Sequence, residues 1–235
     1  NFSDFDPLEN EESIAINWIK ESQNLTKFDL IILPGSKQTI KDQKFLEESG
    51  IMQDIKNYSN NNGNIFGICG GLQMLGTILE DPFLKEGADA NFNKRIKGIG
   101  LLPLKTTFLE KKITRQISSK SLWPCSSDID GFEIHNGVTE LDLTQNTLKI
   151  KPIFKDSNLG WFQENINKST IAGTYIHGIF ENDSWRENFL NLIKKEKIPT
   201  KSDKKTRSYK IKRELIIENL ANEFQKHLNI TELLN

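Results

Sequence analysis

The 235-residue sequence has few cysteines, almost no net charge and no long apolar run. Two cysteines are too few for a disulfide-stapled secreted scaffold and favour a reducing compartment, so we expect a cytoplasmic protein. With 31 basic and 32 acidic side chains, the net charge of −1 provides no attraction to nucleic acid or to an anionic membrane surface. No stretch approaches the roughly 20 apolar residues of a spanning helix, and the acidic start, NFSDFDPLENEE, is unlike a signal peptide. These absences indicate a soluble protein that binds neither nucleic acid nor membrane.

The chain also contains no Gly-Lys dipeptide and therefore no phosphate-binding loop of the Walker A type. The sequence therefore offers no loop of this type to bind the phosphates of ATP. We expect no cofactor and no metal site in it.

Strand and helix patterns alternate along the first part of the chain. Residues 13–19, SIAINWI, alternate apolar and polar positions as a strand does, and LIILPGS at 30–36 is typical of a buried parallel strand that ends in a loop. A helical pattern over 39–58 breaks near Gly50, and NIFGI followed by GGLQMLGTIL at 64–79 predicts a second strand and a short helix. This alternation predicts an α/β fold with an open, mostly parallel sheet flanked by helices.

From Gly98 onward the pattern changes to short strand-like pieces, and the chain ends in helical segments. The last of these repeats Leu215, Leu220, Phe224 and Leu228 on an amphipathic helix. We interpret residues 1–12, which are polar and contain a proline, as an interdomain linker and 13–235 as one domain.

Gly67-Ile68-Cys69-Gly70-Gly71 has the form of a nucleophile elbow with cysteine as the nucleophile. A residue on a sharp strand-to-helix turn is held in a strained conformation, and neighbours without a Cβ let the turn close. A cysteine in the first helical turn also lies near unpaired N–H groups, which favour the thiolate. An arbitrary cysteine is more often a small buried core residue, but the flanking glycines favour a catalytic Cys69.

A cysteine nucleophile needs a base, and the chain has three histidines. His227 lies in a charged helical segment and is interpreted as a surface residue, while His135 and His177 both end strand-like runs. His177 is the better candidate because Glu181 and Asp183 follow it and could orient the imidazole. A lone histidine is usually structural, so this assignment depends on the elbow. Backbone N–H groups of Gly70 and of Gly35, in the Pro-Gly loop, are the candidate oxyanion donors.

Four segments in this order, LIILPGSKQTI, GICGGLQMLG, GFEIHNG and GTYIHGIFEND, together with NFSDFDPL, resemble the triad-type (class I) glutamine amidotransferase domain of the cobyric acid synthase family. The resemblance runs nearly from end to end. It implies the flavodoxin-like fold of class I glutamine amidotransferases. It also implies that Cys69 attacks the side-chain amide of glutamine, that His177 serves as base and acid, and that Gln73 helps to hold the glutamine.

In this family the ammonia passes to a synthetase domain, absent from this chain, that uses ATP and Mg²⁺ to amidate the b, d, e and g carboxylates of a corrinoid. The resemblance therefore implies glutamine, the synthetase domain and a corrinoid, cobyrinic acid a,c-diamide, as partners. Many class I members have a glutamate two residues after the histidine, where this chain has Ile179. Glu181 or a group from elsewhere would then orient His177.

Three alternatives remain open. The domain could serve the related cobyrinic acid a,c-diamide synthase or a Mur-ligase-like cell-wall complex. It could be a non-catalytic docking domain, although intact Cys69 and His177 argue against that. It could also be a cysteine hydrolase with another substrate, which Gln73 argues against.

Overall fold

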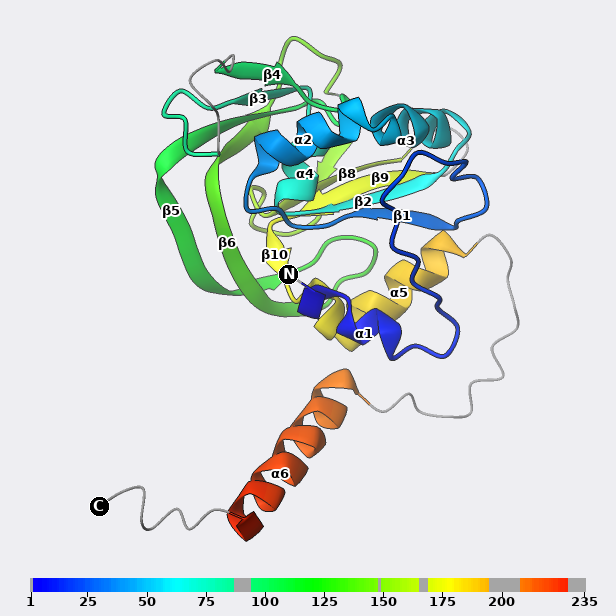
Figure 1. The fold of residues 1–235 in the computed structure, drawn as a ribbon, viewed down its shortest axis with the longest axis vertical. Helices are drawn as coiled ribbons and strands as arrows, with labels where there is room; N and C mark the ends of the chain where they lie inside the picture. Colours follow the sequence, from blue (N-terminus) through cyan, green and yellow to red (C-terminus); the bar gives the residue numbers. More distant parts are fainter. Residues whose placement is uncertain (1, 87–93, 148, 165–168, 195–207, 228–235) are drawn as a thin grey trace.

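The computed structural model describes residues 2–86, 94–147, 149–164, 169–194 and 208–227. Two five-stranded sheets lie side by side, with helices on both faces of the first (Figure 1). The α/β class predicted from the sequence is confirmed.

The first sheet has the strand order β1-β2-β9-β8-β7. Its strands are β1 Leu30–Leu33, β2 Asn64–Ile68, β9 Thr170–Thr174, β8 Gly160–Glu164 and β7 Ile150–Pro152. The strands β1, β2 and β9 pair in parallel, whereas β8 and β7 are antiparallel additions. The carboxyl ends of the three parallel strands meet at one edge, which is where ligands bind in open α/β sheets.

The second sheet has the order β10-β6-β5-β3-β4 and was not foreseen from the sequence. Its strands are β10 Ile176–His177, β6 Asp128–Leu141, β5 Leu104–Lys120, β3 Ile78–Glu80 and β4 Arg95–Lys97. The long strands β5 and β6 form an antiparallel ribbon whose register shifts between Thr107 and Lys112. Since only Tyr175 separates β9 from β10, the chain passes from the first sheet into the second directly before His177.

The helical elements are η1 Phe2–Asp4, α1 Asp6–Glu9, α2 Thr39–Glu48, α3 Ile51–Asn60, α4 Gly70–Leu75, η2 Ile179–Glu181, α5 Asp183–Ile193 and α6 Tyr209–His227. Helices α2 and α3 cover one face of the first sheet, and α1 and α5 lie on the other (Figure 1). The predicted break at Gly50 is confirmed, because Gly50 adopts a left-handed φ of 81° between α2 and α3. Helix α6 projects away from the sheets and buries none of its side chains; Leu228 lies outside the described residues.

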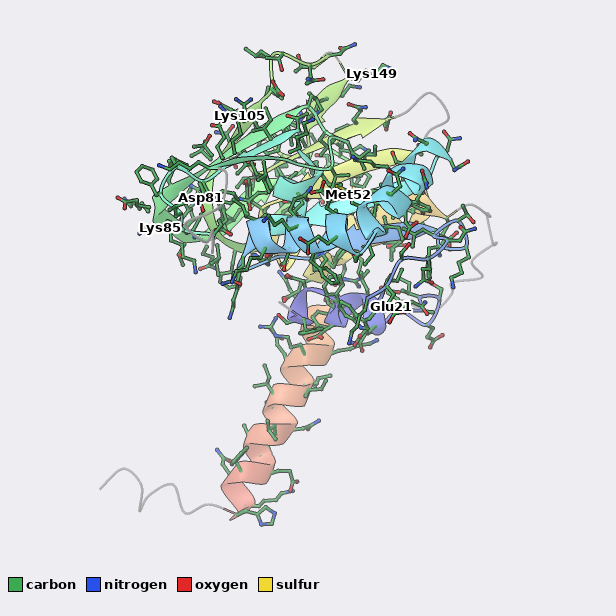
Figure 2. All side chains as sticks on the ribbon, turned by 45° about the horizontal axis from the view of Figure 1, so that its top comes forward. Glu21, Met52, Asp81, Lys85, Lys105 and Lys149 are labelled. Carbon is green, nitrogen blue, oxygen red and sulfur yellow. The ribbon has the colours of Figure 1, made fainter. Side chains whose placement is uncertain are left out.

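An aromatic cluster joins α5 to the first sheet. Phe66 of β2 lies 5.0 Å from the ring of Phe189, which in turn stacks on Trp185 at 4.9 Å. All three side chains are at most 2% exposed, and burying each contributes roughly 2 to 3 kcal/mol. Charged side chains such as Glu21, Lys85 and Lys149 lie on the outside (Figure 2).

The described part of the segment interpreted as a linker, residues 2–12, packs against the domain. Residues 2–9 form η1 and α1, and Phe5 and Leu8 belong to the main hydrophobic core. Glu11 accepts a hydrogen bond from buried Arg186 of α5 at 2.8 Å. Residues 2–12 are thus part of the packed structure.

The strand predicted over residues 13–19 is absent from the structure. From Ile14 to Lys20 the chain has no helix, strand, turn or bend. None of the described helices combines the length and the apolar character of a bilayer-spanning segment.

Candidate active site

Cys69 stands between β2 and α4 in a strained conformation, with φ 51° and ψ −108°. The turn requires glycine on both sides. A Cβ added to Gly71 would lie 2.0 Å from the carbonyl oxygen of Leu33, and one on Gly67 would lie 2.6 Å from the backbone nitrogen of Leu72. The elbow therefore closes only because β1 and the start of α4 can approach these two positions without side chains.

Cys69, His177 and Gly35 converge at the carboxyl edge of the parallel strands. A Cβ added to Gly35 would lie 3.0 Å from Cε1 of His177 and 3.7 Å from Cβ of Cys69. The thiol of Cys69 donates a weak hydrogen bond to the carbonyl oxygen of Ile134 on β6 at 3.4 Å. The second sheet thereby forms one wall of the site.

Asp4 holds the imidazole of His177. Its Oδ2 lies 2.8 Å from Nδ1 of His177, and its Oδ1 accepts a hydrogen bond from the backbone N–H of Gly178 at 2.9 Å. Because the carboxylate accepts the Nδ1 proton, Nε2 is the ring nitrogen left for proton transfer. With Asp4 only 2% exposed, this orientation is fixed by a buried contact.

The surroundings of His177 favour the imidazolium form. Burial by itself disfavours the charged ring, but the hydrogen bond that the ring donates to Asp4, the hydrogen bond with Cys69 and the negative charges of both raise the pKa of His177 to about 9. At neutral pH the site therefore contains a protonated imidazole beside the cysteine. That is the state in which a cysteine nucleophile is most readily a thiolate.

The two predicted oxyanion donors lie in segments that touch. A Cβ on Gly70 would be 2.8 Å from the backbone nitrogen of Ser36, so the loop after β1 lies against the elbow. The N–H of Gly35 makes no hydrogen bond within the part of the chain that the structure describes. As the first residue of α4, Gly70 has an N–H without an intrahelical partner. Both donors are thus available to a developing oxyanion.

Gln73 ties three segments of the site together. Its Nε2 donates to the carbonyl oxygen of Asn136 at 3.0 Å and to the hydroxyl of Tyr175 at 3.2 Å, and its Oε1 accepts from Thr39 at 3.2 Å. The side chain is 2% exposed. Its predicted contact with the substrate glutamine stays a prediction, while its internal contacts give it a positioning role.

A buried carboxylate supports the same region. Glu86 accepts hydrogen bonds from the backbone N–H of Thr39 at 2.8 Å and from the side chain of Asn136 at 3.3 Å. Burial raises the pKa of Glu86 above its usual range, despite these donors. Glu86 therefore links α2, through Thr39, to β6, through Asn136, and both of these residues also bond to Gln73.

The acidic residues after His177 have other partners. Glu181 pairs with Arg213 at 2.7 Å, and Asp183 pairs with Arg186 at 2.9 Å. The imidazole of His177 is therefore oriented by a group from elsewhere in the chain, which is Asp4.

The other two histidines play different parts. His135 is bonded through Nε2 to Glu133 at 2.8 Å and stacks on Tyr175 with ring centroids 3.7 Å apart. It lies beside the site, next to Ile134, rather than on Cys69 itself. His227 is exposed at the end of α6, as expected.

Sequence reasoning missed Asp4, Tyr175 and Glu86. Asp4 is 173 residues from His177, so no local spacing could link them. Glu86 lies in a loop, and only its burial distinguishes it from an ordinary surface glutamate.

A family model matches most of the chain. Residues 1–185 match the model of the CobB/CobQ-like glutamine amidotransferase domain. The chain belongs to this family. Across its whole length it is 72% identical to a protein named cobyric acid synthase from Prochlorococcus marinus subsp. pastoris, and 46% identical to the cobyric acid synthase of strain NATL2A. In both comparisons the chain spans 46% of the relative's length, so it corresponds to about half of these proteins.

A solved structure titled as a glutamine amidotransferase has the same fold. It superposes with a TM-score of 0.59 over 82% of this chain and 94% of its own, at 14% sequence identity. This likeness concerns the fold alone. It agrees with the α/β arrangement around the elbow.

Proposed function

We propose that this domain hydrolyses glutamine at Cys69 and supplies ammonia to the amide-forming part of a cobyric acid synthase. The observation that carries the proposal is the convergence of Cys69, His177 and Gly35 at one point, with His177 held by Asp4. The family match and the relatives named cobyric acid synthase support the same reading.

The chemistry proceeds in two steps. The thiolate of Cys69 attacks the side-chain amide carbon of glutamine, and the N–H groups of Gly35 and Gly70 stabilise the oxyanion. Imidazolium His177 gives its proton to the departing nitrogen, which leaves as ammonia, and a glutamyl thioester remains. His177, now neutral, takes a proton from water, which attacks the thioester and releases glutamate and Cys69.

The ammonia acceptor is assigned through the relatives. The proposed acceptor is a corrinoid whose b, d, e and g carboxylates are amidated, with ATP and Mg²⁺ bound by the part of the polypeptide outside this chain. Cobyrinic acid a,c-diamide is the proposed substrate. The free thiols of Cys69 and Cys125 support a reducing compartment, and we place the protein in the cytoplasm.

The test is glutamate release from glutamine, measured in the full-length protein with ATP, Mg²⁺ and corrinoid present. Replacing Cys69 by serine should abolish release, because serine is a far weaker nucleophile at this site. The matched control is Cys125→Ser, which should retain activity, since Cys125 lies in the loop between β5 and β6, where its Sγ contacts Ser127 and Ser184. Equal activity of the Cys69→Ser variant and the wild type would overturn the proposal.

The acceptor needs its own measurement. Glutamine labelled with ¹⁵N in the side chain should yield labelled corrinoid amides in an ATP-dependent reaction. Labelled free ammonia without labelled corrinoid, under the same conditions, would support glutamine hydrolysis by this domain and overturn the corrinoid as the ammonia acceptor.

A further inference from the structure

Within the described chain, no cation pairs with the buried carboxylate of Glu86. The donors that reach it, Thr39 and Asn136, are uncharged, and the charged group that acts on it is the carboxylate of Asp81, which has the same sign. Because Glu86 is only 3% exposed, a carboxylate at this position costs stability. A charge kept in such unfavourable surroundings, close to a candidate active site, indicates a functional role.

The loop of residues 81–86 is shaped to hold Glu86 in one position. Asp81, which is fully buried, accepts hydrogen bonds from the backbone N–H groups of Lys85 at 2.9 Å and of Glu86 at 2.8 Å. Between them, Leu84 adopts a left-handed φ of 56°, which is unfavourable for a residue with a side chain. Strain of this kind persists only where the surrounding contacts impose it, so the position of Glu86 is strongly determined.

Glu86 caps helix α2 from outside the helix. The N-cap residue, Gln38, makes no side-chain hydrogen bond to the helix end, and Glu86 instead accepts the N–H of Thr39, the first helical residue, at 2.8 Å. The positive end of the helix dipole favours a negative charge at this point. The cap explains why this buried group is a carboxylate.

Helix α2 begins directly after residues 34–38, which we call the Gly35 loop because they carry the candidate oxyanion donor Gly35. This loop lies against the elbow. A Cβ added to Gly70 would lie 2.8 Å from the backbone nitrogen of Ser36 and 3.1 Å from Oγ1 of Thr39. The position of Thr39, which Glu86 fixes, therefore determines how the Gly35 loop meets the elbow.

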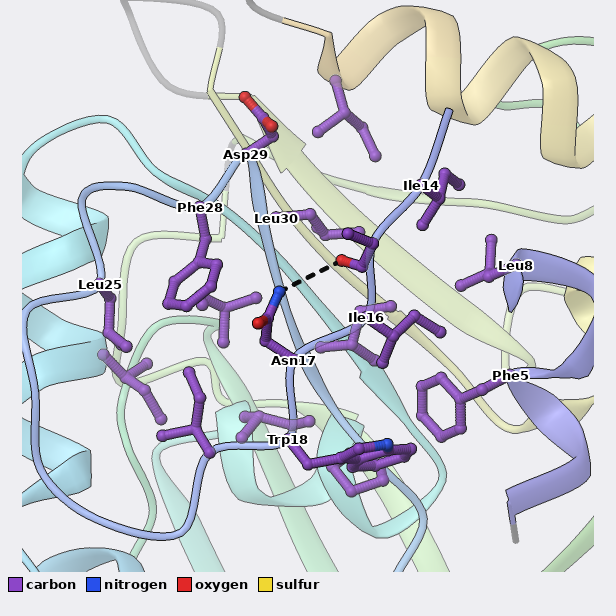
Figure 3. A pocket seen from close by; sticks show the side chains of 18 of the residues that line it. Phe5, Leu8, Ile14, Ile16, Asn17, Trp18, Leu25, Phe28, Asp29 and Leu30 are labelled. Carbon is purple, nitrogen blue, oxygen red and sulfur yellow. Dashed lines mark hydrogen bonds between the residues drawn. The ribbon is translucent and has the colours of Figure 1, made fainter. Parts of the chain in front are cut away.

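Side-chain packing leaves the start of the Gly35 loop open on one side. Pro34 and Gly35 line a cavity of about 850 Å³, which Trp18 also lines (Figure 3). Thr39 and Glu86 do not line this cavity. The loop is therefore held from the side of Glu86 and the elbow.

Glu86 and Gln73 bind the same two residues. Thr39 donates its N–H to Glu86 at 2.8 Å and its hydroxyl to Gln73 at 3.2 Å. Asn136 donates its side-chain amide to Glu86 at 3.3 Å and accepts a hydrogen bond from Gln73 at its carbonyl oxygen at 3.0 Å. These four hydrogen bonds close a ring in which Glu86 is the charged member, so its loss would release both Thr39 and Asn136.

We propose that Glu86 is a positioning residue for the glutaminase reaction: by capping α2, it holds the N–H of Gly35 where the oxyanion of the tetrahedral intermediate forms. The described contacts of Cys69 and His177 do not involve Glu86, so it acts on the rate through the Gly35 loop. This role rests on the proposed function, whereas the capping of α2 does not.

The test compares Glu86→Leu with Glu86→Gln in the full-length protein. Leucine offers no acceptor, so kcat for glutamate release should fall at least about tenfold while KM stays within about twofold, because an oxyanion donor acts mainly in the transition state. Glutamine still offers an acceptor to Thr39, and the amide of Asn136 can turn to accept from it, so kcat should stay within about threefold of the wild type.

Glu110→Gln is the matched control, because Glu110 is an exposed carboxylate that pairs with Lys85, next to Glu86, at 3.7 Å. It should keep the wild-type kcat. Glu86→Asp keeps the charge but shortens the side chain by one methylene, so it should show the same split between kcat and KM if Glu86→Leu does not fold.

Alkylation of Cys69 by iodoacetamide provides a readout that does not depend on an oxyanion donor. The thiolate displaces iodide at a carbon atom and no oxyanion forms, so the rate in Glu86→Leu should stay within about twofold of the wild type. The rate is measured in a Cys125→Ser background, so that Cys69 is the thiol that reacts within this chain. Loss of alkylation in proportion to kcat would overturn the positioning role, because the substitution would then damage the nucleophile as well.

Hydrogen exchange separates failure of this inference from failure of the proposed function. The amide of Thr39 should exchange at least about tenfold faster in Glu86→Leu than in Glu110→Gln, because it loses its acceptor. Wild-type kcat in Glu86→Leu, or unchanged exchange at Thr39, would overturn the inference. If no form of the protein releases glutamate while exchange at Thr39 rises as expected, the proposed function fails and the capping of α2 by Glu86 stands.

Discussion

The Oδ2 atom of Asp4 lies 2.8 Å from Nδ1 of His177, although 173 residues separate them in the chain. In many proteins with a cysteine nucleophile and a histidine base, a third group orients the imidazole. Here the position two residues after the histidine is occupied by buried Ile179, and the N-terminal segment supplies the carboxylate. The proposed catalytic site therefore combines Asp4, near the start of the chain, with His177 at the end of β10.

Asp4→Asn should lower glutamate release by roughly 10²-fold or more at pH 7. The imidazole of His177 would lose the carboxylate that orients it and stabilises its protonated form. Burial alone lowers the pKa of His177, so the alkaline limb of activity should move from about pH 9 to lower pH. The raised pKa of His177 stabilises the fold fully below about pH 6.5, and this stabilisation is lost as the pH rises through about 9. The Asp4→Asn variant should therefore lose most unfolding free energy, relative to the wild type, below about pH 6.5.

The measurement is a pH–rate profile of glutaminase activity, with Asp6→Asn as the control. Asp6 is exposed and lies two residues away in the same segment. An unmoved alkaline limb in the Asp4→Asn variant would show that Asp4 does not control the protonation of His177.

Gly35→Ala and Gly71→Ala should separate activity from stability. The new methyl at position 35 would lie 3.0 Å from Cε1 of His177, a side chain that can shift, so activity should fall strongly with little change in stability. The new methyl at position 71 would meet the backbone oxygen of Leu33 at 2.0 Å, which should cost on the order of 3 kcal/mol or prevent folding. Urea denaturation and glutamate release are measured on both variants. A Gly71→Ala variant as stable as the wild type, or a Gly35→Ala variant with full activity, would contradict the prediction.

Gln73→Leu should destabilise the domain by roughly 1 to 3 kcal/mol and reduce activity, because Thr39, Tyr175 and Asn136 lose a buried hydrogen-bonding partner. Gln53→Leu is the control, since Gln53 is exposed on α3 and should change stability by less than about 0.5 kcal/mol. The midpoint of urea unfolding reports the difference, and equal midpoints for the two variants would contradict it.

Arg186→Met should weaken the attachment of the N-terminal segment. The buried guanidinium, 4% exposed, binds Glu11 and Asp183 and the carbonyl oxygen of Phe180. Since both carboxylates can regain water, we expect a loss of about 2 kcal/mol, less than for a fully buried pair. The exposed pair of Arg213 with Glu181 provides the control, and Arg213→Met should cost at most about 1 kcal/mol.

Limited proteolysis gives a second readout for Arg186→Met. Cleavage within residues 2–20 should become faster than in the Arg213→Met variant, because Glu11 no longer ties this segment to α5. Equal cleavage rates in the two variants would show that the contact with Glu11 does not hold the segment.

The sequence alone determined the elbow and the elements around it. Gly67, Cys69 and Gly71 are local neighbours, and the glycines are needed for a turn whose geometry depends on only a few residues. The strands β1 and β2 and the break at Gly50 are likewise local patterns of apolar period and backbone freedom. Cys69 could therefore be singled out, and His177 could be chosen because it ends a strand.

Only the tertiary structure decided what completes the site and which segments lack a partner. Asp4 was interpreted as part of a linker because its role depends on a contact across the whole chain, and the sequence pattern of residues 2–12 is too short to predict packing. The second sheet and the hydrogen bonds of Gln73 likewise depend on contacts between distant segments. Strand pairing is a property of two segments, so a pattern in one of them, such as residues 13–19, predicts a strand without showing whether its partner is in place.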